Sequence, residues 1–320
     1  MSTEKSKPSV PSPCPICLET RGLYEHLTEV ALAANYLGNE STYESEHGTA
    51  TIKTKTIGDW LMLAAQLKTV DIDAWKFEPL SKTAVYCEPV ADNINACSKH
   101  YTNHATALTR FMFVCNALEE TYRFINHLYE PLSLRKGTSN RQIKRTSSLR
   151  AVALLDDLFE RETGSAAPRD FEHHCGNFIR LFDRYKAGHR VSVAGIDAGA
   201  ENRSTYALQL VRNLRNHVAH GTFPLGPPAD YGGYEDSEEL ALMLRRACRI
   251  SALYMQVILR WFSPELESPD YCAILDANEK EPDWFIEKCT LEYVQDLHVK
   301  SDFALHNGPD GYNALDDEGD

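Results

Sequence analysis

The chain has 320 residues, of which 43 % are hydrophobic, and its formal net charge is -13. The length suffices for two ordinary domains and the hydrophobic content for a buried core, which excludes an intrinsically disordered protein. The negative charge argues against a general nucleic-acid binder held by bulk electrostatics, and no apolar run approaches the roughly 18 residues that a membrane span needs.

The first residues, 1–13, are polar, contain prolines and lack periodicity, so we expect them to be disordered. The N-terminal stretch has no apolar segment typical of a secretory signal, and we expect a cytoplasmic protein without a membrane partner. Nine cysteines at irregular spacings in such a compartment argue against a disulfide framework.

Residues 14–100 predict a small α+β region, because helical and strand-like periodicities alternate along it. Pro79 and Pro89 interrupt its last strand-like stretch. The expected elements are a helix over 19–39, a strand over 48–57, a short helix over 59–70, and one or two strands over 74–90.

Residues 101–263 predict a bundle of long helices, with a C-terminal helix and a polar tail over 264–320, so the chain is expected to be mainly α. The fourth of the long segments carries Ala207, Leu210, Val211, Leu214 and Val218 as one apolar stripe that faces a core. The expected bundle helices cover 104–130, 147–164, 167–188, 204–221 and 237–262.

The same short pattern, R-N-x-x-x-H, occurs twice at the end of that fourth helix. The first copy joins Arg212 and Asn213 to His217, and the second joins Arg215 and Asn216 to His220. An arginine suits a phosphate group, and a histidine takes or gives a proton near neutral pH. Together they suffice for RNA cleavage in which the ribose 2′-hydroxyl attacks the adjacent phosphorus, and no metal is needed because the substrate supplies the nucleophile.

Helical geometry complicates this chemistry. Arg215 and His220 are five residues apart, so on a regular helix they point in directions roughly 140° apart. Either the helix loosens before Gly221, or two chains pair around a two-fold axis and each contributes residues to a shared cleft.

The sequence around the second copy, "LRNHVAHG" within a helical bundle, resembles the HEPN superfamily (higher eukaryotes and prokaryotes nucleotide-binding domains) over roughly residues 101–263. The resemblance implies a HEPN-like bundle with Arg215, Asn216 and His220 as catalytic residues. It further implies a metal-independent endoribonuclease, active as a homodimer, that leaves 2′,3′-cyclic phosphate ends and serves in antiviral or toxin–antitoxin systems. An antitoxin or regulatory protein is then a further expected partner.

Other residues are candidates for contacts with RNA phosphates. Arg212 and His217 of the first copy are either supporting contacts or a chance repetition, and both copies together are alternatively an exposed polar face without function. A basic segment over 134–150 contributes Arg141, Lys144 and Arg145, and its alternative is a solvated loop.

Cys14 and Cys17 have the spacing of a zinc knuckle. We expect Cys97 and His100 to complete a structural zinc site, with Cys87 and His104 as alternatives; cysteines without a metal are the other interpretation. We interpret His173 and His174 as surface or capping residues. For the whole chain, the alternative to a nuclease is a non-catalytic helical module that dimerises or binds RNA or a partner.

Overall fold

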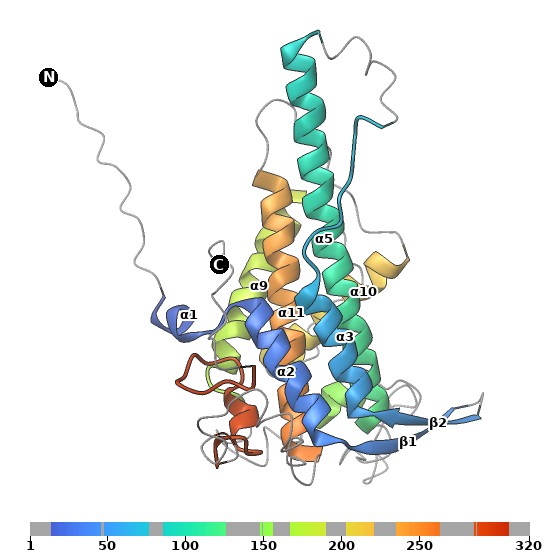
Figure 1. Ribbon diagram of the computed structural model, residues 1–320, viewed down its shortest axis with the longest axis vertical. Coiled ribbons are helices and arrows are strands. Elements are labelled where there is room, and N and C mark those ends of the chain that lie inside the picture. Colours follow the sequence, from blue (N-terminus) through green and yellow to red (C-terminus); the bar gives the residue numbers. More distant parts are fainter. Residues whose placement is uncertain are drawn as a thin grey trace, which may run out of the picture.

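The computed structural model describes residues 14–45, 48–76, 86–125, 148, 150–155, 167–189, 203–220, 235–262, 285 and 287–306. The described part is mainly helical, with one two-stranded antiparallel sheet (Figure 1). Its elements are α1 Pro15–Glu19, α2 Leu23–Leu37, β1 Glu40–Ser45, β2 Gly48–Lys53, α3 Thr54–Gln66, α5 Glu88–Ile125, α9 Phe171–His189, α10 Arg203–Ala219, α11 Glu235–Phe262 and the 3-10 helix η1 Tyr293–Asp296.

Helix α11 is the centre of the molecule and contacts α2, α5, α9, α10 and η1 (Figure 1). All its residues from Ala247 to Leu259 are buried. A helix that is buried around its whole circumference needs other elements to cover every side of it, and here they do. The buried residues of the other helices join those of α11 in a single hydrophobic core.

Helices α2 and α3 form a closely packed pair on one side of α5 and α11. Gly58 of α3 makes their close approach possible, because a Cβ at this position would lie 2.7 Å from the backbone oxygen of Ala31. The β1–β2 hairpin connects the two helices, with Glu40 paired to Lys53 at one end and Ser45 to Gly48 at the other.

The C-terminal segment 293–306 is held against the middle of α2 by a buried carboxylate. Glu29 has no exposed surface and accepts hydrogen bonds from the backbone amides of Leu305 (2.8 Å) and His306 (3.0 Å) and from the Tyr293 hydroxyl (3.2 Å). Its carboxylate also contacts Nδ1 of His306. A buried carboxylate requires such partners, so these contacts hold the segment in one position.

The N-terminal elements differ in detail from the prediction. The strand expected over 48–57 is confirmed only as far as Lys53, and β1 was not predicted, although it supplies the partner that any strand needs for its hydrogen bonds. The strands expected over 74–90 are wrong where the structure describes them, because residues 74–76 form a turn and Glu88 begins α5. Pro89 lies in the first helical turn, where a missing N–H costs nothing.

Helix α5 begins well before the expected residue 104, and the boundary expected between residues 100 and 101 falls inside it. The helices expected over 167–188, 204–221 and 237–262 correspond to α9, α10 and α11. The expected helix over 147–164 is helical at 148 and 150–155, and its other residues, like residues 1–13, lie outside the described ones. No helix in the described part of the chain combines the length and the apolar character that a bilayer span requires.

Candidate functional site

Helix α10 presents one side to the core and the other to the surface. Of the predicted apolar stripe, Ala207, Leu210, Val211 and Leu214 are buried and Val218 is half-buried against the core. The helix packs on α9, α11 and α5. The second side carries both copies of the R-N-x-x-x-H pattern, whose residues are half-buried or exposed. The stripe therefore fixes which way the polar pattern faces.

Arg215 is oriented toward α5. Its Nη2 lies 3.5 Å from the Glu119 carboxylate, and both side chains keep 35 % of their surface exposed. Its Nη1 donates a 3.2 Å hydrogen bond to Oδ1 of Asn216. The guanidinium group is therefore held at the surface by an acid on one helix and by an amide on its own.

A buried tyrosine of α5 lies close enough to these charges for them to act on its hydroxyl group. Tyr122 of α5 is 2 % exposed, and burial raises the pKa of its hydroxyl well above the usual value. The negative charge of Glu119 raises this pKa further, whereas the positive charges of Arg212 and Arg215 lower it. All three charged groups thus act on one buried atom, which places Arg212 in the same electrostatic neighbourhood as Arg215.

His220 lies just beyond the last residue of α10 and is exposed. Its backbone N–H still donates a 3.0 Å hydrogen bond to the Asn216 carbonyl, which is the helical i to i−4 contact. The helix therefore does not loosen before His220, and Arg215 and His220 keep the divergent directions of a regular helix. Of the two arrangements that the sequence left open, the distorted helix end is not what the structure has.

The histidine of the first copy is held by its own helix. Nδ1 of His217 lies 2.8 Å from the Asn213 carbonyl oxygen, and because a carbonyl only accepts, Nδ1 carries the proton. Arg212 and His217 are half-buried on the same helix as the second copy. The basic residues Arg141, Lys144 and Arg145, expected to contact RNA, lie outside the described residues.

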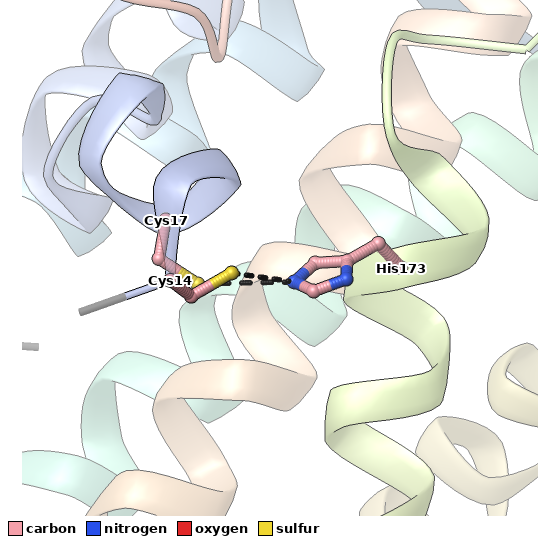
Figure 2. Close-up of side chains that lie close together, drawn as sticks. All are labelled: Cys14, Cys17 and His173. Atoms are coloured by element: carbon pink, nitrogen blue, oxygen red, sulfur yellow. Dashed lines mark hydrogen bonds between the residues drawn. The ribbon is translucent and has the colours of Figure 1, made fainter. Parts of the chain in front are cut away.

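A second group of chemically active side chains lies far from this helix end. Figure 2 shows the thiols of Cys14 and Cys17 directed at the imidazole ring of His173. Nε2 of His173 is 3.5 Å from Sγ of Cys14 and 3.9 Å from Sγ of Cys17. Among the described residues, these three form a group with the geometry to hold a metal ion.

Local structure brings the two thiols together. Cys14 is the N-cap of α1 and Cys17 is its third residue, so both lie at one end of a single helical turn. The pKa of the Cys14 thiol is lowered, first by the backbone N–H of Cys17 and also by the Cys17 side chain, while desolvation and, to a smaller extent, the carboxylate of Asp170 oppose this shift. A thiol stabilised as a thiolate is the form that binds metals.

The structure does not bring the partners that the sequence suggested to this pair. Cys97 and His100 lie on α5, as does the alternative His104, and neither Cys97 nor His100 joins the group around Cys14. Figure 1 shows the first turns of α5 at the top of the molecule and α1 well below them, on its left side. The physical reason is that residues 88–125 form one continuous helix, which carries Cys97 away from the N-terminus.

His173, interpreted from the sequence as a surface or capping residue, takes their place. It stands on the first turn of α9, and 156 residues separate it from Cys17. The tandem histidines at 173–174 were visible in the sequence, but their spacing gives no metal-ligand pattern. Only the packing of α1 beside α9 identifies His173.

Comparison with known proteins adds no further information about the site. No protein-family model, no curated protein and no solved structure matches this chain.

Proposed function

We propose that the protein is a metal-independent endoribonuclease of the HEPN type, with Arg215, Asn216 and His220 as its catalytic residues. One observation carries this proposal. The three residues stand together at the surface end of α10, and the opposite side of the same helix is anchored in the core. A rigid helix end that exposes an arginine, an asparagine and a histidine offers the groups that cleavage of RNA by its own 2′-hydroxyl requires.

In the proposed reaction, His220 removes the proton of a ribose 2′-hydroxyl. The 2′-oxygen forms a bond to the adjacent phosphorus, the bond from phosphorus to the 5′-oxygen breaks, and that oxygen takes a proton from water as it leaves. Arg215 stabilises the negative charge that develops on the phosphoryl oxygens. The products carry a 2′,3′-cyclic phosphate on one fragment and a 5′-hydroxyl on the other.

The helix geometry requires a second copy of the chain for this reaction. Because α10 stays regular up to the amide of His220, Arg215 and His220 of one chain do not converge on one phosphate. Two chains related by a two-fold axis at this helix end would place the arginine of one beside the histidine of the other. We therefore propose a homodimer in which the cleft between the two copies of α10 binds RNA.

The test is cleavage of mixed tRNA, mRNA and rRNA by the purified full-length chain in the presence of a chelator. We expect products with cyclic phosphate ends, and we expect His220→Ala and Arg215→Ala to lower the cleavage rate by about 10²- to 10⁴-fold. Arg184→Ala is the matched control, because Arg184 is an exposed arginine of α9 paired with Glu239. Full activity in both catalytic variants would refute the site.

His217→Ala separates the two copies of the pattern. If the second copy performs the chemistry, His217→Ala weakens RNA binding but leaves a measurable rate, whereas His220→Ala removes it.

The same variants bear on the biological role: we propose a toxin or an antiviral effector, restrained by an antitoxin or regulatory protein. Expression of the natural chain should then arrest cell growth, and expression of His220→Ala should not.

The ion pair between Arg215 and Glu119 favours a second candidate, a non-catalytic helical module that binds RNA or a partner. A nearby carboxylate weakens the attraction of an arginine for phosphate, and the net charge of -13 acts in the same direction. A mobility shift of RNA without any cleavage product, unchanged in His220→Ala, would identify this function.

A further inference from the structure

Helix α1 contributes no fully buried side chain to the hydrophobic core, since Ile16 and Cys17 are half-buried and its other residues are exposed. It has five residues and none of them is buried, and Leu18 exposes 57 % of its surface. An isolated helix of this length is unstable in water, because the first turn fixes several residues for a single hydrogen bond. Another interaction must therefore stabilise α1 against the rest of the molecule.

The contacts of α1 with the described part of the chain lie at its two ends. At the C-terminal end, the amide of Lys300 donates a 2.8 Å hydrogen bond to the carbonyl of Glu19, and Thr20 forms a β-bridge with Val299. At the N-terminal end, the contacts include those of the two thiols with His173 (Figure 2). This second attachment brings together three metal-binding groups.

The distances within the group fit a tetrahedral metal ion. Zinc bonds of about 2.3 Å to sulfur and about 2.0–2.1 Å to nitrogen place the two ligand atoms about 3.6 Å apart at a tetrahedral angle. The distances from His173 Nε2 to Cys14 and Cys17, 3.5 and 3.9 Å, bracket this value. The chain therefore needs little movement to bind such an ion.

The hydrogen bonds around His173 show that the ring nitrogen nearest the thiols, Nε2, carries no proton. Arg180 donates to Oδ1 of Asn177, so the amide NH₂ of Asn177 is the group directed at His173. It lies 2.9 Å from Nε2, and because an NH₂ group only donates, Nε2 accepts. Nε2 is therefore unprotonated and lies within 3.9 Å of both sulfur atoms, and a neutral imidazole nitrogen is the form that coordinates a metal.

We propose that Cys14, Cys17 and His173 bind one zinc ion, with a solvent molecule in the fourth position, and that this ion joins α1 to α9. Two thiolates and an imidazole are soft and intermediate ligands, which favour zinc over magnesium or calcium. On binding, the ion replaces the hydrogen bond between Asn177 and His173. The site lies on the face of α9 toward α1, so the ion has a structural role separate from the proposed cleavage of RNA.

Cobalt binding to the reduced full-length chain, followed by displacement with zinc, tests this proposal. We expect one equivalent of Co²⁺ per chain, with the visible absorption of a tetrahedral site and a thiolate-to-cobalt band in the near ultraviolet. Cys14→Ser, Cys17→Ser and His173→Ala should each weaken binding by more than about 100-fold, the upper effect of losing only an outer partner of a ligand. Because α1 buries no side chain, these variants should keep the circular dichroism of the natural chain.

Two further variants make the result decisive. Cys97→Ser is the matched control and should bind cobalt as the natural chain does, because Cys97 lies on α5 outside the group. His173→Cys should keep the ion and strengthen the thiolate-to-cobalt band, since it exchanges nitrogen for a third sulfur. A natural chain that binds no cobalt, or a His173→Ala variant that binds it fully, overturns the proposal. The readout does not involve RNA, so its failure is distinct from failure of the nuclease.

Discussion

The polar end of α10 and the cysteine–histidine group beside α1 are assembled in opposite ways. Arg215, Asn216 and His220 lie within six residues of one helix, so the sequence alone brings them together. Cys14 and His173 are separated by 159 residues, and only the packing of two helices brings them together. The residues of the first group are neighbours in the sequence, but the side chains of Arg215 and His220 point away from each other. The residues of the second group are far apart in the sequence, but their side chains meet.

This difference matters for function. A pattern on one helix can be complete and still require a second molecule, because residues five apart on a regular helix do not face one another. A group that converges within one chain needs only an ion of the right size. The proposed nuclease would therefore depend on association of two chains, whereas the proposed metal site would not.

The largest expected effect comes from mixing two inactive variants of the α10 site. Arg215→Ala and His220→Ala should each lose about 10²- to 10⁴-fold in rate. If each active site takes its arginine from one chain and its histidine from the other, half of the randomly mixed dimers carry one intact site. The mixture should then recover about a quarter of the natural activity, measured as release of cyclic phosphate ends.

The control for this mixture is each variant mixed with itself, which should remain inactive. Recovery requires exchange of chains, so the two variants are unfolded and refolded together or expressed together. A mixture that stays as inactive as its components would place the whole site within one chain. The α10 site would then need only one chain, as the cysteine–histidine group does.

Acid should destabilise the fold through its buried histidines. His298 is 1 % exposed, and its pKa is lowered to about 4, mainly by burial and further by the charge of Arg249. Burial likewise lowers the pKa of His26 well below its usual value. In the unfolded chain these histidines bind protons below a pH of about 6.5, whereas in the folded chain they stay neutral. The free energy of unfolding therefore decreases as the pH falls from about 6.5 to about 4.

For His298 alone, this linkage costs about 2 kcal/mol of unfolding free energy at pH 5 relative to pH 7.5. The measurement is urea unfolding at the two pH values for the natural chain and for His298→Gln. We expect the difference between the two pH values to shrink by that amount in the variant. An unchanged difference would mean that His298 does not resist protonation.

The fold was predictable where one periodicity continues for many residues. The stripe from Ala207 to Leu214 predicted α10 and its buried side, because helical spacing over several turns has no other interpretation. The region between Trp75 and Val90 was not predictable in the same way. Its β-branched and aromatic residues resemble strands, but Glu88 and Pro89 begin a helix because Pro is accepted in a first turn.

The two sites were predictable to different extents for the same reason. Cys14 and Cys17 were recognised as a pair because their spacing is local. Their partner His173 was not, since nothing in a sequence states which residues meet after a hundred or more positions. Nothing in the sequence pairs Glu119 with Arg215 either, because their contact depends on how α5 and α10 pack.

Removing the charge of Glu119 tests whether this carboxylate competes with RNA phosphate for Arg215. Exposed ion pairs contribute about 0.2–1 kcal/mol, so Glu119→Gln should release Arg215 for phosphate and lower the KM for RNA by up to about fivefold. We expect kcat to change less than KM. Glu120→Gln is the matched control, because Glu120 pairs with Arg123 on the same helix. An increase in KM would show instead that Glu119 positions the arginine.

The smallest expected effect concerns the apolar side chain of α1. Leu18 is largely exposed, so Leu18→Ala should change the unfolding free energy by less than about 0.5 kcal/mol and leave cobalt binding unchanged. Leu27→Ala of α2 provides the contrast, since Leu27 has no exposed surface and its truncation should cost about 2–5 kcal/mol. Chemical unfolding measures both. If Leu18→Ala were as damaging as Leu27→Ala, apolar contacts would hold α1, and the cysteine–histidine group would no longer be needed to explain its position.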